Sequence, residues 1–221
     1  GQSCVGDHFA WFVENCVPES YEQEARVRGI SIHQLLSEKL STYKAGASGL
    51  LALDWFNGVR TPLMDFNLNG LIMGMNLLTK PEEIYLSLIE ATAYGTRMII
   101  EGFEEAGLEV KDITLSGGIP IKNEMLVQVY SDVCNRKIKV VALGAAILGA
   151  AAAPERITGF KNANEAAKKL GKVKDKVWEP NQDNVEIYNE LYEEYKTLHT
   201  YFGTGINDVM KHLNNIRERR K

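Results

Sequence analysis

The chain has 221 residues, of which 45% are hydrophobic and 24% charged, a composition typical of a soluble globular protein. Lysine and arginine total 25 and aspartate and glutamate total 29, so the net charge is −4 and no broad basic field can hold a nucleic-acid backbone. The longest apolar stretch, residues 142–153, is well short of the ~20 residues that a membrane span needs. Nucleic acid as the main partner and a transmembrane protein as the class are therefore excluded.

The cysteines indicate a reducing compartment. Cys4, Cys16 and Cys134 form no Cys-x-x-Cys pair and leave an odd number. This pattern fits reduced thiols in a cytoplasmic protein better than a disulfide framework, and we expect buried, inert thiols. The chain opens on Gly1 with no methionine and no charged leader, which favours a fragment of a longer chain.

The first third of the chain predicts two helices and a strand. Residues 7–17 carry bulky apolar side chains typical of a short helix with one buried side. Residues 31–44 have helical apolar spacing, with Ser31 as the expected N-cap. The apolar run 50–56 predicts a buried strand, and residues 57–62 then supply turn and loop signals.

The strongest helix signal covers residues 81–106. Thr79 and Glu82 are spaced as a capping box at its start, and Gly107 is expected to end it. Apolar residues lie on more than one side, which predicts a helix buried over much of its circumference.

An α/β pattern follows. Residues 113–115 and 138–141 read as strands, and residues 123–135 as the amphipathic helix between them. The Ala- and Gly-rich segment 142–153 predicts a tightly packed helix that Pro154 stops, while 155–182 is looser and more charged. This order predicts an α/β fold with helices packed on the faces of a sheet.

Two helices, over about 183–200 and 206–218, are expected to complete the chain. Ile187, Leu191, Tyr195 and Leu198 lie on one face of the first. That face is expected to pack back on the domain, and pairing as a homodimer is the open alternative.

Common nucleotide and metal motifs are absent. The chain lacks the Gly-x-x-x-x-Gly-Lys-Ser/Thr loop, and its Gly203-Thr204-Gly205 run reads as a turn between helices. The four histidines lie far apart in sequence with no cysteine at ligand spacing, so no metal site is predicted.

The pair Gly117 and Gly118 is a different kind of signal, because it ends a strand shortly before a helix. A backbone without Cβ atoms lets an adenine or a phosphate lie directly against it. The alternative interpretation of the glycine pair is a plain turn between the strand and the helix. Asn123, at the start of the helix, is either a polar contact to a nucleotide or a simple N-cap.

Several motifs in one order resemble a known family. The chain resembles the C-terminal domain of the FGGY carbohydrate kinases over essentially its whole length, through residues 54–62, 89–97, 116–118 with Gln128 and Asp132, and 142–146. Residues 53–65 and 201–210 are most similar to the branch of the family that acts on L-ribulose.

The resemblance implies an actin/Hsp70-like (ribonuclease H-like) ATPase domain, with a sheet flanked by helices and further C-terminal helices. Residues 1–221 would be the C-terminal nucleotide-binding domain of a two-domain sugar kinase, with 183–221 as a helical extension within it. ATP and Mg²⁺ would bind in a cleft against the protein's own N-terminal domain. The implied reaction transfers the γ-phosphoryl group of ATP to the 5-hydroxyl of L-ribulose, as in L-arabinose breakdown.

The resemblance also assigns residues. Gly117 and Gly118 would contact the adenosine with Asn123 beside them, and Lys122 competes with Asn123 for that polar contact. Gly6 would lie near the phosphates, and Arg60 is read as structural. The catalytic aspartate and a Gly-Thr phosphate loop would lie upstream of Gly1, so this chain alone is expected to be inactive.

Three alternatives stay open. The chain is a kinase for L-ribulose, a kinase of the same family for another sugar or polyol, or a non-catalytic binding domain of the same fold. Val141 directly precedes Ala142, whereas the family has several residues between this strand and helix. A genuine deletion and an omitted loop both explain that junction.

Overall fold

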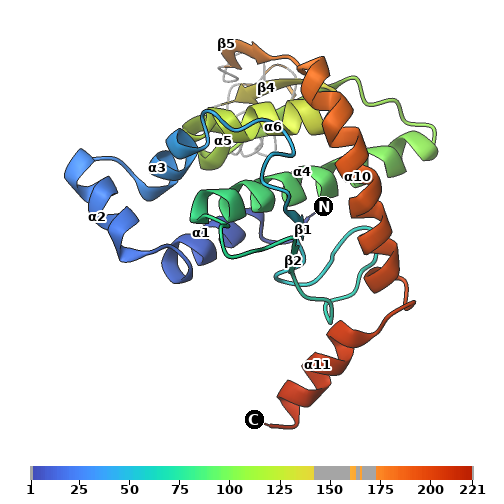
Figure 1. Ribbon diagram of the computed structural model, residues 1–221. Helices are drawn as coiled ribbons and strands as arrows, with labels where there is room; N and C mark the ends of the chain where they lie inside the picture. The colour runs from blue at the N-terminus through green and yellow to red at the C-terminus, as the bar shows by residue number, and fades with distance from the viewer. Residues whose placement is uncertain (1, 142–159, 163–164, 166–172, 221) are drawn as a thin grey trace.

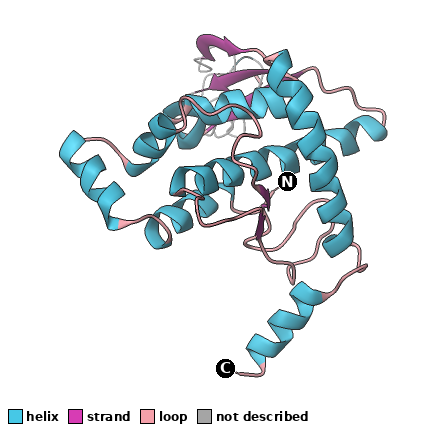
Figure 2. Ribbon diagram, in the orientation of Figure 1, coloured by secondary structure: helices cyan, strands magenta, loops and turns pink. Residues whose placement is uncertain are grey.

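The computed structural model describes residues 2–141, 160–162, 165 and 173–220. In these ranges the helices are α1 (Val5–Asn15), α2 (Glu19–Arg28), α3 (Ile32–Lys39), α4 (Pro81–Glu105), α5 (Gly118–Lys122), α6 (Glu124–Cys134), α10 (Gln182–Gly203) and α11 (Val209–Glu218) (Figure 1). The strands are β1 (Leu51–Leu53), β2 (Leu71–Met73), β3 (Asp112–Ser116), β4 (Lys137–Val141) and β5 (Val173–Trp178). The predicted α/β class is confirmed, and helices make up most of the described chain (Figure 2).

Two small sheets organise the strands. In the first, β3 pairs parallel to β4, which pairs antiparallel to β5, with Ile138 opposite both Ile113 and Trp178. In the second, β1 pairs antiparallel to β2. Neither β2 nor β5 is predicted by the sequence, because β2 is only three residues long and β5 lies in a charged stretch that reads as a loop.

Most predicted helices are confirmed, with shifted ends. Ser31 is the N-cap of α3, and its hydroxyl oxygen accepts a hydrogen bond from the Gln34 amide at 3.1 Å. Helix α2 is not predicted, because it buries only Ala25 and so lacks an apolar stripe. The predicted helix over 142–153 and the Val141–Ala142 junction lie outside the described residues.

The capping box predicted for α4 is wrong by one residue. Lys80 is the N-cap, and its amide donates to Glu83 Oε2 at 2.7 Å, while Thr79 Oγ1 accepts from the Asn76 amide in the preceding turn. The reason is Pro81: its ring disfavours helical backbone at the residue before it and suits the first helical position. Lys80 is accordingly extended, with ψ 155°.

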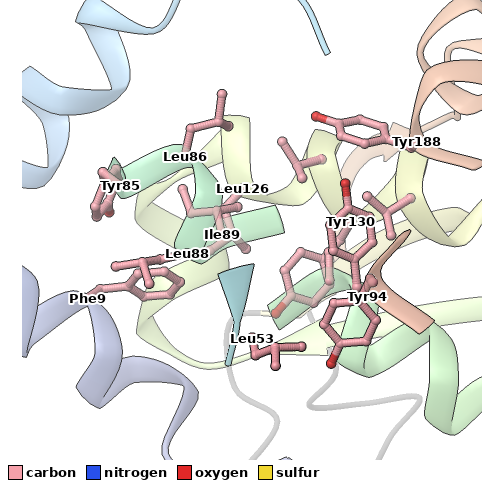
Figure 3. Close-up of a cluster of buried hydrophobic side chains, with 14 of the residues drawn as sticks. Phe9, Leu53, Tyr85, Leu86, Leu88, Ile89, Tyr94, Leu126, Tyr130 and Tyr188 are labelled. Carbon is pink, nitrogen blue, oxygen red and sulfur yellow. The ribbon is translucent and has the colours of Figure 1, made fainter. Parts of the chain in front are cut away.

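Helix α4 is the centre of the core. It is buried on all sides from Tyr85 to Gly95, and it contacts α1, α3, α6, α10 and β1. Figure 3 shows Leu88, Ile89 and Tyr94 of this helix among side chains from the surrounding elements. The prediction that this helix is buried over much of its circumference is confirmed.

Helix α10 packs back on the domain, as predicted, through a face that includes Leu191, Tyr195 and Leu198 of the predicted stripe. Its buried residues are Val185, Tyr188, Tyr192, Tyr195 and His199. Ile187, which the sequence places on the packing face, is instead exposed. Three tyrosines occupy this face because their large rings bury more apolar area than aliphatic side chains do. Each tyrosine hydroxyl also donates a hydrogen bond to an acceptor across the interface.

Those acceptors are the carboxyl groups of acidic side chains. The Tyr188 hydroxyl donates to Glu90 Oε1 at 3.1 Å and the Tyr195 hydroxyl to Asp54 Oδ1 at 3.0 Å. Asp54 also accepts from Gln2 Nε2 at 2.9 Å. Burial raises the pKa of Glu90 to about 8 and that of Asp54 to about 6, since water no longer solvates the charged forms.

Asp132 joins α6 to the start of α10. Its Oδ1 accepts from Gln128 Nε2 and from the Asn181 amide, both at 2.8 Å, and its Oδ2 accepts from Asn184 Nδ2 at 2.8 Å. Gln128 and Asp132, two residues of the motifs described above, therefore help to hold α6 against the start of α10.

The remaining sequence-based expectations have mixed outcomes. Gly203 is the last residue of α10, and Thr204 and Gly205 lie in the predicted turn between α10 and α11. All three cysteines are free and Cys134 is buried, but Cys16 is exposed, so the expectation of buried thiols is wrong there. No helix within the described ranges combines the length and apolar character that crossing a membrane requires.

Replacing Glu90 with glutamine should flatten the pH dependence of stability. Because the folded-state pKa of Glu90 is about 8 against 4.5 for the free side chain, its contribution is fully present below pH 4.5 and is lost as pH rises through 8. The loss is of the order of 4–5 kcal/mol. The introduced carboxamide keeps an acceptor for the Tyr188 hydroxyl and does not titrate, so the free energy of unfolding, measured by urea denaturation from pH 5 to 8, should fall less in Glu90→Gln than in wild type.

Glu105→Gln, at the exposed end of the same helix, is the matched control and should keep the wild-type pH profile. An unchanged slope in Glu90→Gln would contradict the assigned titration of this buried carboxyl.

Candidate functional site

A cavity of about 870 Å³ lies where α1, α3 and the start of α6 meet. Its volume is within the roughly 300–1,000 Å³ typical of small-molecule sites. The lining mixes apolar and polar side chains: Gly6, Phe9, Ala10, Ser31, His33, Gln34, Ser37, Glu38, Ser41, Tyr85, Gly118, Ile119, Lys122, Asn123, Glu124 and Met125.

The glycine pair forms the turn that connects β3 to α5. Gly117 has φ 108° and ψ −178°, a backbone region that is essentially restricted to glycine. Gly118 is helical and has no such constraint. A Cβ added at either position would meet no atom within 4 Å, and both residues are exposed. The fold therefore explains the glycine at 117 but not the one at 118.

A second hollow, of about 320 Å³, borders the same turn and is lined by Gly117, Gly118, Leu115, Tyr130 and neighbouring residues. Gly118 lines both hollows, whereas Gly117 lines only the smaller one. Gly118 thus borders both hollows, and its exposed backbone is open to a ligand in either one.

Gly6 reaches the larger cavity from α1. A Cβ at this position would approach Ile119 Cδ1 to 3.1 Å, so the glycine lets α1 pack closely against α5. The structure therefore brings Gly6, Gly118, Lys122 and Asn123 to one cavity, although Gly6 is separated from the others by more than 100 residues in sequence.

Asn123 is the N-cap of α6. Its Oδ1 accepts from the Leu126 amide at 3.0 Å, so the N-cap alternative is confirmed and this oxygen is already engaged. Its side chain also contacts the Tyr85 hydroxyl. Lys122 is exposed at the cavity. A ligand at this edge therefore meets the carboxamide of Asn123 and the exposed ammonium group of Lys122.

Two polar residues of the cavity are not identified from the sequence. His33 Nδ1 lies 3.1 Å from the Tyr85 hydroxyl, which joins α3 to α4 on the cavity wall. Burial lowers the pKa of His33 and raises that of Tyr85 to about 12, so both groups are neutral at pH 7. Only the helical periodicity around Tyr85 signals its burial, and nothing in the sequence pairs it with His33.

Arg60 lies away from this cavity. It is exposed, its carbonyl accepts from the Met64 amide at 2.9 Å, and it borders a small hollow with Asp54 and Tyr195. The structural role of its side chain stays a prediction. Among the residues that the structure describes, no three His, Cys, Asp or Glu side chains gather as a metal site.

Comparison with known proteins identifies relatives over the whole chain. Residues 1–153 match the family model for the C-terminal domain of the FGGY family of carbohydrate kinases. The ribulokinase of Bacillus licheniformis is 51% identical over 223 residues, which cover 98% of this chain and 40% of that protein. The chain thus spans about 40% of the length of the curated relatives it matches.

Solved structures share the fold at lower identity. The xylulose kinase of Rhodospirillum rubrum has a TM-score of 0.66 at 20% identity and covers 88% of this chain and 37% of its own. The Plasmodium falciparum glycerol kinase determined with ADP has a TM-score of 0.64 at 20% identity, covering 91% and 38%.

The two glycines should respond differently to alanine. Gly117→Ala forces a side chain into a glycine-only region, which costs about 1–3 kcal/mol. Gly118→Ala keeps helical backbone and meets open space, so it should change local stability by less than about 0.5 kcal/mol. Amide hydrogen exchange over residues 112–123 measures both, and equal effects of the two substitutions would contradict the assigned geometry.

Proposed function

This chain belongs to the FGGY family of carbohydrate kinases, and on that premise we propose that it is the adenosine-binding part of an ATP-dependent L-ribulose kinase. Its fold is that of the actin/Hsp70-like ATPases. Residues 1–221 form the C-terminal nucleotide-binding domain, with 183–221 as a helical extension within it, and the protein's own N-terminal domain completes the cleft. The choice of L-ribulose follows the ribulokinases that are up to 51% identical to this chain.

The observation that carries the proposal is the open backbone at Gly118 beside a cavity of about 870 Å³. A side chain at 118 is compatible with the fold, so the bare backbone is best explained by a ligand that lies against it. A planar adenine ring fits this requirement. The glycerol kinase that shares this fold was determined with ADP, which supports a nucleotide here.

The lining divides into parts that suit a nucleoside. Phe9, Ile119 and Met125 supply apolar surface for the base. Asn123 and Lys122 supply polar contacts at the edge of the cavity. Gly6 lies where α1 packs closely against α5, and we assign this position to the phosphate end of the nucleotide. Burial lowers the pKa of His33, so this side chain adds no positive charge beside the base at pH 7.

In the proposed reaction the 5-hydroxyl oxygen of L-ribulose bonds to the γ-phosphorus of ATP, and the bond from that phosphorus to the bridging oxygen breaks to release ADP. The hydroxyl proton passes to a carboxylate, which we place in the upstream domain. Mg²⁺ supplies charge neutralisation on the phosphates when bound. The described residues offer no Mg²⁺ ligand set, so we assign none. The residues of this chain hold and orient the nucleotide.

We place the protein in the cytoplasm, because all three cysteines are free and Cys16 is exposed to solvent.

Gly118→Trp should weaken ADP binding to the full-length protein at least tenfold, because the indole occupies the space that the proposed adenosine needs. Isothermal titration of ADP measures this loss. Gly102→Trp is the matched control: Gly102 is also helical and a Cβ there meets nothing within 4 Å, yet it lies on α4 away from the cavity. Equal binding by both variants and wild type would refute the adenosine site.

Full-length protein should form ADP in the presence of L-ribulose faster than with D-xylulose or glycerol, whereas residues 1–221 alone should show no turnover. A coupled ADP assay measures both. Turnover by the isolated segment would place the catalytic base in this chain and contradict the proposal, and nucleotide binding without turnover on any sugar would favour a non-catalytic domain.

A further inference from the structure

The side chain of Gln2 lies in the segment that leads into α1, and both of its polar atoms are hydrogen-bonded. Its Nε2 donates to Asp54 Oδ2 at 2.9 Å and to the Thr92 carbonyl oxygen at 2.7 Å. Its Oε1 accepts from the Thr96 hydroxyl at 2.8 Å. A carboxamide both donates and accepts, which this set of three partners requires. One side chain therefore ties the segment before α1 to α4 and to the residue that follows β1.

Gly95 of α4 supplies the space for this carboxamide. A Cβ at position 95 would lie 2.3 Å from Gln2 Nε2 and 2.9 Å from Asp54 Oδ2. Glycine inside a helix destabilises it relative to alanine, so such a residue needs a local reason. Gly102, also inside α4, has no such neighbour, because a Cβ there would meet nothing within 4 Å. The bare backbone at Gly95 is therefore matched to the side chain of Gln2.

The start of α1 has no side-chain cap of its own. Cys4, the N-cap residue, has left-handed backbone with φ 55° and makes no capping hydrogen bond through its side chain. That backbone region is unfavourable for a residue with a Cβ. Asn57 Nδ2 donates to Cys4 Sγ, but this contact is exposed to solvent. Further along α1, Phe9 is buried and its ring packs against Tyr85, so the core holds the middle of the helix.

The segment that Gln2 ties down borders the proposed nucleotide site. Gly6, in the first turn of α1, lines the large cavity at the position assigned to the phosphate end. Gln2 and Val5 line the smaller hollow, which shares Gly118 with the large cavity. A displacement of the segment before α1 would therefore move Gly6 relative to Gly118.

We propose that Gln2 is a positioning residue of the nucleotide site: its carboxamide, seated against Gly95, holds the start of α1 so that Gly6 meets the phosphates. This role rests on the proposed function, because the nucleotide is the ligand concerned. Gln2 acts through Gly6 and not by contact with the nucleotide. Its effect is selective, since the phosphate end depends on the start of α1 while the base lies against Phe9, which the core holds.

Gln2→Met in the full-length protein keeps the length of the side chain and removes its three hydrogen bonds. ADP, followed by isothermal titration, should bind at least fivefold more weakly. Adenosine, followed by ligand-observed NMR, should change by less than twofold. A residue needed only for folding would lower the melting temperature without separating these two ligands. Gln23→Met, exposed on α2 and outside both hollows, is the control and should bind both ligands as wild type does.

Gly95→Ala is a second test that leaves Gln2 itself unchanged. The added Cβ displaces the carboxamide, so ADP should again bind at least fivefold more weakly while adenosine binding is kept. Gly102→Ala adds the same methyl group to the same helix in open space and should leave ADP binding unchanged. Because alanine favours a helix over glycine, a loss at position 95 cannot come from a weaker α4.

Wild-type ADP affinity in both Gln2→Met and Gly95→Ala overturns the proposal, and so does an equal loss of ADP and adenosine. If Gln2→Met does not fold, Gly95→Ala decides alone. Failure of the wild-type protein to bind ADP refutes the nucleotide site and this role of Gln2 with it. That result is distinct from normal wild-type binding with unaffected variants, which refutes the role of Gln2 only.

Discussion

The structure depends on the complete burial of the first half of α4. From Tyr85 to Gly95 this helix has no face left for solvent, so other elements must enclose it, and α1, α3, α6, α10 and β1 do so. A carboxyl group, Glu90, is buried with the apolar residues, and α10 must supply the Tyr188 hydroxyl to satisfy it. The packing around α4 therefore fixes both which elements lie together and how α10 is rotated.

The candidate site follows from this packing. Because α1 and α6 both pack on α4, the turn at Gly117 and Gly118 is brought against the start of α1, and the large cavity forms between α1, α3 and α6. Gly6 permits the close approach, and Tyr85 of α4 itself forms part of the cavity wall with His33.

The sequence predicts what depends on neighbouring residues and misses what depends on distant ones. The cap at Ser31, the long α4, and the glycine turn after β3 follow from local patterns and are confirmed, as is the α/β class. The burial of Tyr188 and Tyr192 on α10 is not predictable locally, because the acceptors of their hydroxyl groups lie 98 and 91 residues away in the chain. The pairing of His33 with Tyr85, 52 residues apart, has no sequence signal either, and motif order rather than any single residue identifies the family.

The central claim is that the open backbone at Gly118 and the cavity beside it receive the adenosine of ATP. Hydrogen exchange of the full-length protein, with and without saturating ADP, tests this claim most directly. Amides of residues 116–123 and 5–10 should exchange at least tenfold more slowly with ADP, because those segments line one cavity from two sides. Protection by ADP confined to other segments, with unchanged exchange in both of these, would contradict the claim.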